Sequence, residues 1–509
     1  MTDSPPMVED DHLAAFRHVY ATLRLDLLPE FVSGLRQKIL SQKSPIGCKV
    51  NPEPVFGSHH ILFQIDFIDE ARWMIKVPAN GYERAFDELS ARALESEALT
   101  MELIKRKTTI PIPEVFDFSS TCDNPLGCSF ILMEYVDGRP LYDAWFDRSI
   151  APDILQQHRD QALRGIAEAM IQLQKFTFQQ GGTVLFGTDG NPSGDVGPFR
   201  TVDVNAMLDN LREDDTYDGS HVFHEIAPIS DVKSYFTYAL NRREPPSDEF
   251  SQGIYRLLNL FIDLAVKECQ SQHKEEKKFI LSHPDFDIQN IIVSKTDGSL
   301  LGIIDWDGVI AVPRCVSGNE GYPSWLTRDW DPAKYMYRDK TDPDSEDAGS
   351  IYESSPAELA SFRRRYQEIV AEVSNNPLSK NTTHDSLFLS NLKIAADDPV
   401  CTDGIIGKIF DEIKAKTSVL GSSVANEVTD SQNERDSVKR ESFEQENVTL
   451  EKSDSEEDDD DDDDDDDFYL YEVCTDLVKG ELEKEQLERL VKGFKALFLH
   501  DTDTPLDVK

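Results

Sequence analysis

The chain has 509 residues, 39% of them hydrophobic and 9% aromatic, which is enough for a sizeable core together with some polar length. Its net charge of −44 argues against binding to nucleic acid or to an anionic membrane, because both require a basic surface. Seven scattered cysteines show no zinc-site spacing and indicate reduced thiols. No targeting signal is evident at the N-terminus, and no segment reaches the ~18 apolar residues of a membrane span. We therefore expect a cytoplasmic protein that binds neither nucleic acid nor membrane.

The first part of the chain predicts a helical extension over 1–49 and then a small lobe over 50–136 in which strands predominate. The stretch "HILFQIDF" (60–67) is rich in strand formers, and "RWMIKVP" (72–78) alternates between apolar and polar residues. Only a short turn separates the two, so we expect a β-hairpin. A helix follows over about 86–106 and ends before a pair of prolines.

The next part of the chain predicts a larger, mostly helical lobe over 137–420. An apolar strand over 130–138 leads into it, and a long helix is expected over 152–182. After residue 200 the pattern is again mostly helical, except around residues 279–309, where apolar runs flank a polar loop. A small sheet with one helix, followed by a larger helical part, is a bilobal α+β arrangement.

An acidic tract interrupts this pattern over residues 421–467, with 21 acidic and 4 basic residues and ten consecutive aspartates at its end. We expect a disordered insertion, because so little apolar surface cannot offset the entropy lost on ordering. A basic protein partner would suit the tract. Ser453 and Ser455 resemble acidic-directed phosphorylation sites, and the alternative is an unmodified linker.

Apolar residues return at helical spacing within 468–509, which predicts a final helix that docks on the helical lobe. The residues of this stripe are Leu487, Leu490, Val491, Phe494, Leu497 and Phe498.

The candidate catalytic and metal-binding residues lie in the segment "FILSHPDFDIQNIIVSKTDGSLLGIIDWDGV". His283, Asp285 and Asn290 share one short loop, and Asp305 stands at the end of a later apolar run. One interpretation is a solvated surface loop between strands, and the other is a magnesium–nucleotide site. Magnesium prefers oxygen ligands and keeps several waters, so one Asp, one Asn and phosphate oxygens are sufficient. The spacing His-x-Asp-x-x-x-x-Asn supplies a base and a metal ligand on one loop.

The motifs "SHPDFDIQN" and "GIIDWD" resemble the catalytic loop and metal motif of the aminoglycoside-phosphotransferase-like enzymes, which are relatives of the protein kinases. This resemblance implies a bilobal, protein-kinase-like fold and the use of ATP with Mg²⁺. It implies Asp285 as the catalytic base and His283 as the structural support of the loop. It also implies Asn290 and Asp305 as magnesium ligands.

The resemblance extends to the N-terminal lobe. Lys76 in "MIKVP" resembles the lysine that binds the nucleotide phosphates, and Glu97, twenty-one residues later, resembles its helix partner. Gly57 and Ser58 in "FGSHH" stand where the phosphate-covering loop belongs. The stretch "ILMEYVDG" resembles the hinge that holds adenine, with Met133, Glu134 and Val136 as the expected contacts.

The sequence also departs from the protein-kinase pattern. It has no G-x-G-x-x-G loop, no Phe-Gly after Asp305 and no Ala-Pro-Glu motif, which favours a small-molecule kinase over a protein kinase. The family often has Gly where Pro284 stands. Asp287 replaces the loop lysine of protein kinases, and we interpret Asp287 and Asp307 as local hydrogen-bonding groups. The triplet His158-Arg159-Asp160 matches the His-Arg-Asp of the protein-kinase catalytic loop, but the residues around it have a helical pattern. We therefore interpret it as part of a solvated helix face.

We therefore predict an ATP-dependent phosphotransferase that acts on a hydroxyl of a small molecule. A non-catalytic nucleotide-binding scaffold of the same fold and a protein kinase are the alternatives. The intact metal and base residues argue against the scaffold, because a dead relative has no chemical need of them.

Overall fold

The computed structural model describes residues 11–213, 222–272, 279–338, 352–437 and 468–500. The chain forms two compact units. Unit 1 comprises Met1–Tyr238, Cys269–Asp329 and Met336–Leu387, and unit 2 comprises Ala239–Glu268, Trp330–Tyr335 and Phe388–Lys509.

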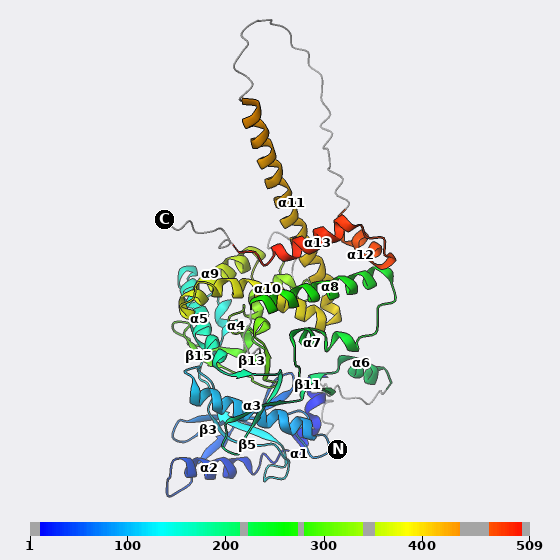
Figure 1. Ribbon diagram of the computed structural model, residues 1–509. Coiled ribbons are helices and arrows are strands. Elements are labelled where there is room, and N and C mark those ends of the chain that lie inside the picture. Colours follow the sequence, from blue (N-terminus) through cyan, green and yellow to red (C-terminus); the bar gives the residue numbers. More distant parts are fainter. Residues whose placement is uncertain (1–10, 214–221, 273–278, 339–351, 438–467, 501–509) are drawn as a thin grey trace, which may run out of the picture. The chain divides into compact units, whose positions relative to one another are not determined.

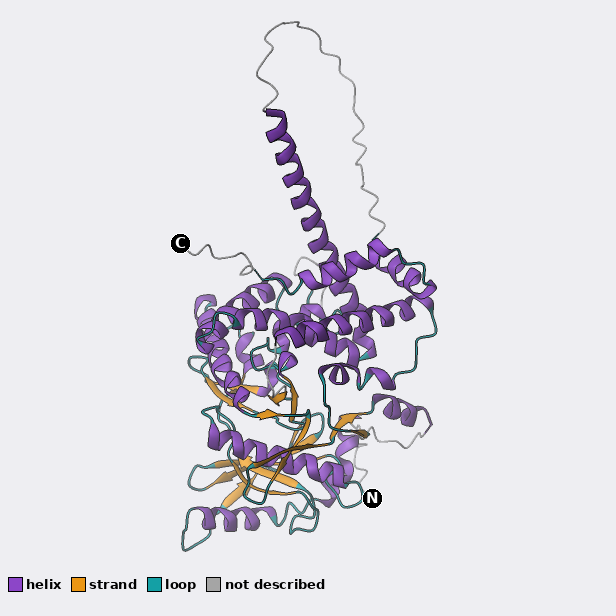
Figure 2. Ribbon diagram, in the orientation of Figure 1, coloured by secondary structure: helices purple, strands orange, loops and turns teal. Residues whose placement is uncertain are grey.

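Every described strand lies in unit 1. Figure 1 labels several of the strands, and Figure 2 draws all described strands in orange. The strands are β1 (Cys48–Val50), β2 (Val55–Phe56), β3 (His60–Phe67), β4 (Arg72–Pro78), β5 (Val115–Ser119), β6 (Phe130–Glu134), β7 (Arg139–Pro140), β8 (Thr177–Phe178), β9 (Gly182–Phe186), β10 (Pro192–Gly197), β11 (Phe199–Val202), β12 (Phe223–Ile226), β13 (Phe279–Ser282), β14 (Ile291–Val293), β15 (Leu300–Ile303) and β16 (Ile310–Pro313).

Helices occur in both units. They are α1 (Arg17–Thr22), α2 (Leu28–Ile39), α3 (Glu88–Lys107), α4 (Leu141–Trp145), α5 (Pro152–Met170), α6 (Val204–Glu213), α7 (Val232–Thr237), α8 (Glu249–Gln272), α9 (Pro356–Ser374), α10 (Ser379–Asp397), α11 (Pro399–Ser437), α12 (Leu470–Lys479) and α13 (Lys484–Ala496). None of the described helices combines the length and the apolar character that crossing a membrane requires.

The N-terminal sheet has the antiparallel order β1-β3-β4-β6-β5, with β2 paired to the start of β3. The predicted hairpin is confirmed: β3 and β4 pair in register from His60 opposite Pro78 to Asp66 opposite Arg72. Ile61, Phe63 and Ile65 alternate along β3 and are fully buried, as one covered sheet face requires. The helix α3 packs near the sheet and agrees with the helix expected over 86–106.

The chain leaves this sheet earlier than the sequence suggests, since β6 ends at Glu134 and the strand was expected to reach Gly138. Gly138 approaches β14 so closely that a Cβ atom there would lie 2.3 Å from Ile292 Cγ2. The short strand β7, which follows, pairs with β14. Packing against β14 therefore determines the path of the chain after β6. This contact forms only when distant segments of the chain come together in the fold.

The segment around the predicted chemical loop forms the expected strands. β14 pairs antiparallel with β15, with Ile291 opposite Ile303, and β13 pairs with β16 and β8. These pairs hold the ends of the loop 283–290 and the residues after β15 in place. The predicted α+β fold class, with both helices and strands, is confirmed.

Residues 177–226 differ from the prediction, which expected a helix up to residue 182 and mostly helix after residue 200. The helix α5 ends at Met170, a 3-10 turn ends at Lys175, and β8 to β12 follow. Gly182 has a φ of +150° and lies against the carbonyl of Gly197, a backbone approach that favours glycine. The helical interpretation of Asp160 is confirmed, since it lies on α5 and pairs with Arg365 at 3.2 Å.

Unit 2 contains helices and no strand among its described residues. Phe494 of α13 is fully buried and stacks on Phe261 of α8, with ring centroids 5.0 Å apart. The single final helix of the prediction is divided into α12 and α13, because Gly480 takes a left-handed conformation that ends α12. Leu487, expected on the buried stripe, is 39% exposed.

The acidic tract begins inside a helix. α11 continues to Ser437, so residues 421–437 are helical, although the sequence suggested disorder from 421. Neither proline nor glycine occurs between 422 and 437, and extending an existing helix costs little per residue. Residues 438–467, with Ser453, Ser455 and the aspartate run, lie outside the described residues.

Candidate active site

Lys76 places its ammonium group between two carboxylates from distant parts of unit 1. Its Nζ atom lies 2.8 Å from Glu97 Oε1 on α3 and 2.8 Å from Asp305 Oδ1, after β15. Lys76 and Glu97 are 5% and 3% exposed. Buried charges are tolerated when they are paired and hydrogen-bonded to one another. The structure therefore brings together three of the residues that the motifs single out.

The charges of this cluster shift one another's protonation equilibria. Burial works against the ammonium form of Lys76, but the charges of Glu97, Asp305 and Asp307 raise its pKa well above the ordinary value. Burial raises the pKa of Glu97 to about 7, opposed by Lys76 and assisted by the other carboxylates. Burial also disfavours the charge of Asp305, yet Lys76 outweighs it and lowers the pKa of Asp305. Lys76 thus keeps its positive charge at neutral pH.

The loop between β13 and β14 brings Asp285 and Asn290 together. Asn290 is 7% exposed, and its Nδ2 donates to the backbone oxygen of Asp285 at 2.9 Å and to Asp285 Oδ2 at 3.0 Å. Burial and the charge of Asp287 raise the pKa of Asp285, while the bond from Asn290 opposes this. A raised carboxylate pKa brings the group closer to the range that suits a general base.

His283 connects this loop to the segment after β15. Its Nδ1 accepts a hydrogen bond from the backbone N–H of Asp285 at 3.2 Å, and its Nε2 donates to the Ile304 carbonyl at 3.0 Å. Accepting at one nitrogen and donating at the other requires the neutral ring. Burial lowers the pKa of His283 to about 4, which agrees with this assignment.

Asp305 lies at a sharp change of backbone direction directly after β15. Its φ is +61°, in the left-handed region that few residues adopt but aspartate tolerates. Trp306, the next residue, is fully buried, donates from Nε1 to the Ile303 carbonyl at 3.0 Å and lies against the His283 ring. The buried indole fixes the turn and leaves the Asp305 side chain 45% exposed.

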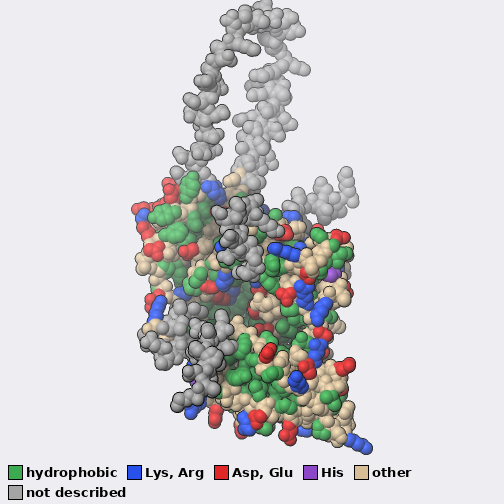
Figure 3. Space-filling view, turned by 180° about the vertical axis from the view of Figure 1, so that it is seen from behind, with side chains coloured by type: hydrophobic (Ala, Val, Ile, Leu, Met, Phe, Trp, Pro, Cys, Tyr) green, Lys and Arg blue, Asp and Glu red, His purple; other side chains and the backbone are tan. Residues whose placement is uncertain are grey.

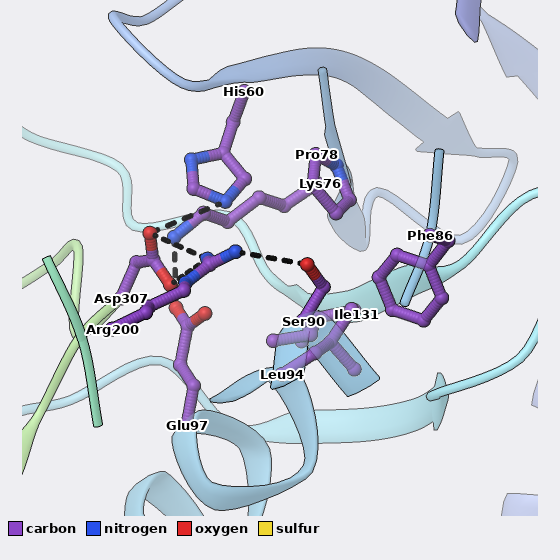
Figure 4. A pocket seen from close by; sticks show the side chains of 10 residues that line it. All are labelled: His60, Lys76, Pro78, Phe86, Ser90, Leu94, Glu97, Ile131, Arg200 and Asp307. Atoms are coloured by element: carbon purple, nitrogen blue, oxygen red, sulfur yellow. Dashed lines mark hydrogen bonds and ion pairs between the residues drawn. The ribbon is translucent and has the colours of Figure 1, made fainter. Parts of the chain in front are cut away.

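Two residues that the motifs did not identify lie beside Lys76. Arg200 on β11 donates from Nη2 to both carboxylate oxygens of Asp307, at 3.0 and 3.3 Å (Figure 4). His60 Nε2 lies 3.8 Å from Asp307 Oδ2, and burial lowers the pKa of His60 to about 3. Leu62 pairs with Lys76 across the sheet, so the period-two alternation puts His60 on the same face as Lys76. No sequence signal marks Arg200.

Asp287, which the sequence suggested as a local hydrogen-bonding group, accepts from the backbone N–H of Ile288 at 2.6 Å. Both of its oxygens also bind Arg328 Nη2, at 3.2 and 3.0 Å. Arg328 Nη1 in turn binds Glu353 Oε1 at 3.0 Å. Asp287 is therefore engaged in neutralising an arginine next to the loop.

The remaining predicted nucleotide contacts lie on the N-terminal sheet and its margins. Gly57 and Ser58 are exposed in the tight turn between β2 and β3, where the Gly57 N–H donates to the His60 carbonyl at 2.8 Å. Met133 and Glu134 lie on β6 opposite Met74 and Trp73 of β4.

Two of the residues expected in the hinge, Glu134 and Val136, contact neighbouring protein groups. Glu134 Oε2 accepts from the Glu114 N–H at 3.1 Å and lies 3.4 Å from Lys105. Val136 lies against Gly302 of β15. The side chain of Glu134 is thus occupied by protein groups.

The donor set is suited to a hard divalent cation. Asp305 offers a carboxylate, and Asn290 directs its amide nitrogen to Asp285, so its carbonyl oxygen is the atom that could serve as a ligand. Carboxylate and amide oxygens are the ligands that Mg²⁺ accepts. Phosphoryl transfer requires three kinds of group: a fixed lysine, oxygen ligands for a metal ion, and a carboxylate that can act as a base.

Residues 69–314 match the sequence profile described as "APH: Phosphotransferase enzyme family". A subtelomeric hrmA-associated cluster protein of Aspergillus fumigatus is 25% identical over 284 residues, which are 46% of this chain and 53% of that protein. The chain thus spans about half the length of that relative. The mitochondrial protein "Altered inheritance of mitochondria protein 9" of Kluyveromyces lactis is 26% identical over 136 residues, 26% of this chain and 22% of that protein.

Among solved structures, aminoglycoside phosphotransferase APH(3'')-Id of Streptomyces rimosus is 15% identical, with a TM-score of 0.33, and the alignment covers 72% of this chain and 98% of that one. The mitochondrial relative contradicts the cytoplasmic location expected from the sequence, and that expectation is withdrawn. The resemblance that the motifs indicated is confirmed in this form: residues 69–314 match the phosphotransferase enzyme family.

Proposed function

We propose that this protein is an ATP-dependent kinase that transfers the γ-phosphate to a hydroxyl group of a small molecule. The observation that carries the proposal is the position of Lys76, whose ammonium group contacts Glu97 and Asp305 at 2.8 Å each. These three residues come from β4, α3 and the segment after β15, so motifs that lie far apart in the sequence converge on one point. The convergence argues against the interpretation of the loop as an ordinary surface feature.

Each residue of the proposed site has a physical task. Lys76, charged at neutral pH, would bind the phosphate oxygens of the nucleotide, and Glu97 would hold its ammonium group in position. Asp285 would accept the proton of the acceptor hydroxyl and orient its oxygen toward the γ-phosphate. His283 would keep the loop and the metal motif in register through its two backbone hydrogen bonds.

Magnesium fits the oxygen donors of Asn290 and Asp305. When bound there, it would neutralise charge on the phosphate oxygens during transfer. The protein's own contribution is to fix the ligand positions, through the Asn290–Asp285 hydrogen bonds and through the buried Trp306. We expect nucleotide binding to depend on magnesium or manganese, and indifference to EDTA would contradict the proposal.

The decisive experiment is a metabolite-extract screen with γ-labelled ATP, in which the wild type is compared with Asp285→Asn. The substitution keeps the size of the side chain and removes the base, so transfer should fall roughly 10²–10⁴-fold while ADP affinity stays within a few-fold. Asp305→Ala should instead weaken magnesium–nucleotide binding itself. Label transfer by Asp285→Asn at the wild-type rate would exclude the catalytic assignment. Binding without transfer in the wild type would favour the scaffold alternative.

The name of the Kluyveromyces lactis relative leads us to propose a mitochondrial location for this protein as well. Fractionation of cells that express the full chain with a C-terminal tag should find the protein with mitochondrial markers. Protease treatment of the intact organelles, with and without detergent, distinguishes an internal protein from one attached to the surface. Recovery with cytosolic markers alone would contradict this part of the proposal.

A further inference from the structure

The guanidinium group of Arg200 contacts two parts of the proposed site at once. Its Nη2 binds both oxygens of Asp307, two residues after Asp305, and its Nη1 donates to Ser90 Oγ at 3.4 Å in the first turn of α3. The group also lies over the Phe223 ring, 4.5 Å from the centroid. The Arg200 side chain is 8% exposed and that of Asp307 is 16% exposed, so the ion pair is largely shielded from water.

We infer that Arg200 is a positioning residue: it ties α3 to the metal motif and thereby holds the Lys76–Glu97–Asp305 cluster in its assembled geometry. The inference rests on the proposed function and goes beyond it, because it assigns control of the site to the two-stranded sheet of β11 and β12. Ser90 and Glu97 are seven residues apart on α3 and therefore lie on the same side of the helix. A group that holds Ser90 beside Asp307 also fixes the side of α3 from which Glu97 reaches Lys76.

A second contact between the β11–β12 sheet and α3 supports this assignment. Glu225, directly opposite Arg200 in the β11–β12 register, lies 3.8 Å from Arg92 on α3. Ser90 Oγ is itself held by Asn80 Nδ2 at 2.8 Å. The β11–β12 sheet thus meets the first two turns of α3 at these two polar positions, and of the two residues Arg200 continues to the metal motif through Asp307.

Arg200 borders two spaces in the structure. Together with Ser90 and Pro78 it lines the small pocket around Lys76, which Figure 4 shows, and also a cavity of about 270 Å³. Truncation of Arg200 would let water from the larger cavity approach Lys76, which weakens a buried ion pair by raising the local dielectric constant. It would also leave Asp307 without its arginine.

The test compares Arg200→Met and Arg200→Lys with the matched control Arg212→Met on α6, where the arginine side chain is 74% exposed and pairs with Asp209. Hydrogen–deuterium exchange of the full chain measures the protection of backbone amides in each segment and does not require activity. In Arg200→Met, exchange should rise in the first turns of α3 and in residues 304–308, and remain at the wild-type level in α5.

Arg200→Lys retains the charge that faces Asp307, so the protein should fold. Its single ammonium group cannot also reach Ser90, so exchange should rise in α3 and change little in residues 304–308. The control should match the wild type in both segments. Wild-type exchange in α3 for both Arg200 variants would overturn the inference.

Affinity for MgADP gives the second readout. Arg200→Met should bind roughly 10–100-fold more weakly, the scale on which loss of a residue that supports metal ligands lowers affinity. The thermal midpoint of Arg200→Lys should stay near that of the wild type while its affinity falls. If the wild type itself does not bind MgADP, the proposed kinase function fails, and the exchange data still decide whether Arg200 holds α3 to the metal motif.

Discussion

At the scale of single residues, the proposed site combines local strain with charge pairing. Asp305 has a φ of +61°, a conformation that costs free energy for most side chains. Its carboxylate recovers part of this cost by pairing with Lys76 at 2.8 Å. Strained backbone that persists because the surroundings hold it in place is common at functional sites.

Two substitutions of Asp305 should separate strain from charge. Both Asp305→Asn and Asp305→Ala remove the carboxylate and should weaken MgADP binding by roughly tenfold or more. Asparagine tolerates the left-handed region and alanine does not, so Asp305→Ala should be less stable than Asp305→Asn by about 1 kcal/mol. Urea unfolding measures the difference. Because the loss of charge is common to both variants, equal stabilities would show that the backbone is not strained there.

The buried histidines give the protein a defined response to acid. His283 has its pKa lowered to about 4 by burial, whereas the unfolded chain protonates near the ordinary value of about 6.5. The unfolded state therefore binds the proton first, and stability falls as the pH drops below about 6.5 until it reaches about 4. His60 acts in the same direction.

We expect His283 to account for a loss of about 2 kcal/mol of unfolding free energy between about pH 7 and about pH 5. Denaturant unfolding at several pH values should show a shallower decline in His283→Gln than in the wild type, whatever its absolute stability. A decline unchanged in His283→Gln would mean that this ring is not held neutral in the folded state.

At the scale of elements, an aromatic contact between α8 and α13 contributes to the packing of unit 2. Phe494 of α13 is fully buried against Phe261 of α8, and Gly493 lies close to Ile413 of α11. The same helix carries Leu487, which is 39% exposed although it belongs to the apolar pattern. The two residues differ in burial and share a helix, which makes them a matched pair.

Phe494→Ala should lower the unfolding free energy by about 3–5 kcal/mol, because it removes a large buried side chain and leaves a cavity. Leu487→Ala should change it by less than about 0.5 kcal/mol, as is usual for an exposed position. Chemical denaturation followed by circular dichroism measures both. Similar losses in the two variants would contradict the packing of α13.

At the scale of the whole molecule, charge is the dominant feature. The net charge is −44, although acidic and basic side chains are intermixed on the described surface that Figure 3 shows. Such an excess of like charge destabilises the compact state through self-repulsion, and salt screens this repulsion over about 10 Å at 0.1 M ionic strength. Much of the excess lies in the acidic tract, whose last ten residues are all aspartates.

We expect the thermal midpoint of the full chain to rise as sodium chloride is increased from low ionic strength to about the physiological level. A variant that lacks residues 438–467 should show a weaker dependence on salt and nearly the same midpoint at high salt. A midpoint that falls strongly on deletion at all salt concentrations would show that the tract contributes to the folded structure.

Local sequence pattern is sufficient to specify part of this fold. The hairpin of β3 and β4 has the predicted bounds, because alternation and a short turn are sufficient to define it. The order of Lys76, Glu97, Asp285, Asn290 and Asp305 indicated the family, because the chemistry of phosphate and magnesium restricts which residue types can serve. The prediction misses the strands between 177 and 226: β8 and β9 pair with the distant β13 and β16, and β11 pairs with β12 across a connection that contains α6.

Only the tertiary structure decided which charges meet. The contact between Lys76 and Asp305 spans 229 residues, and no local periodicity can specify it. Arg200 carries no motif, yet folding places it between Ser90 and Asp307. Sequence patterns report what each segment buries, whereas the pairing of buried charges depends on how distant segments pack. That pairing sets the protonation of Lys76 and the position of α3.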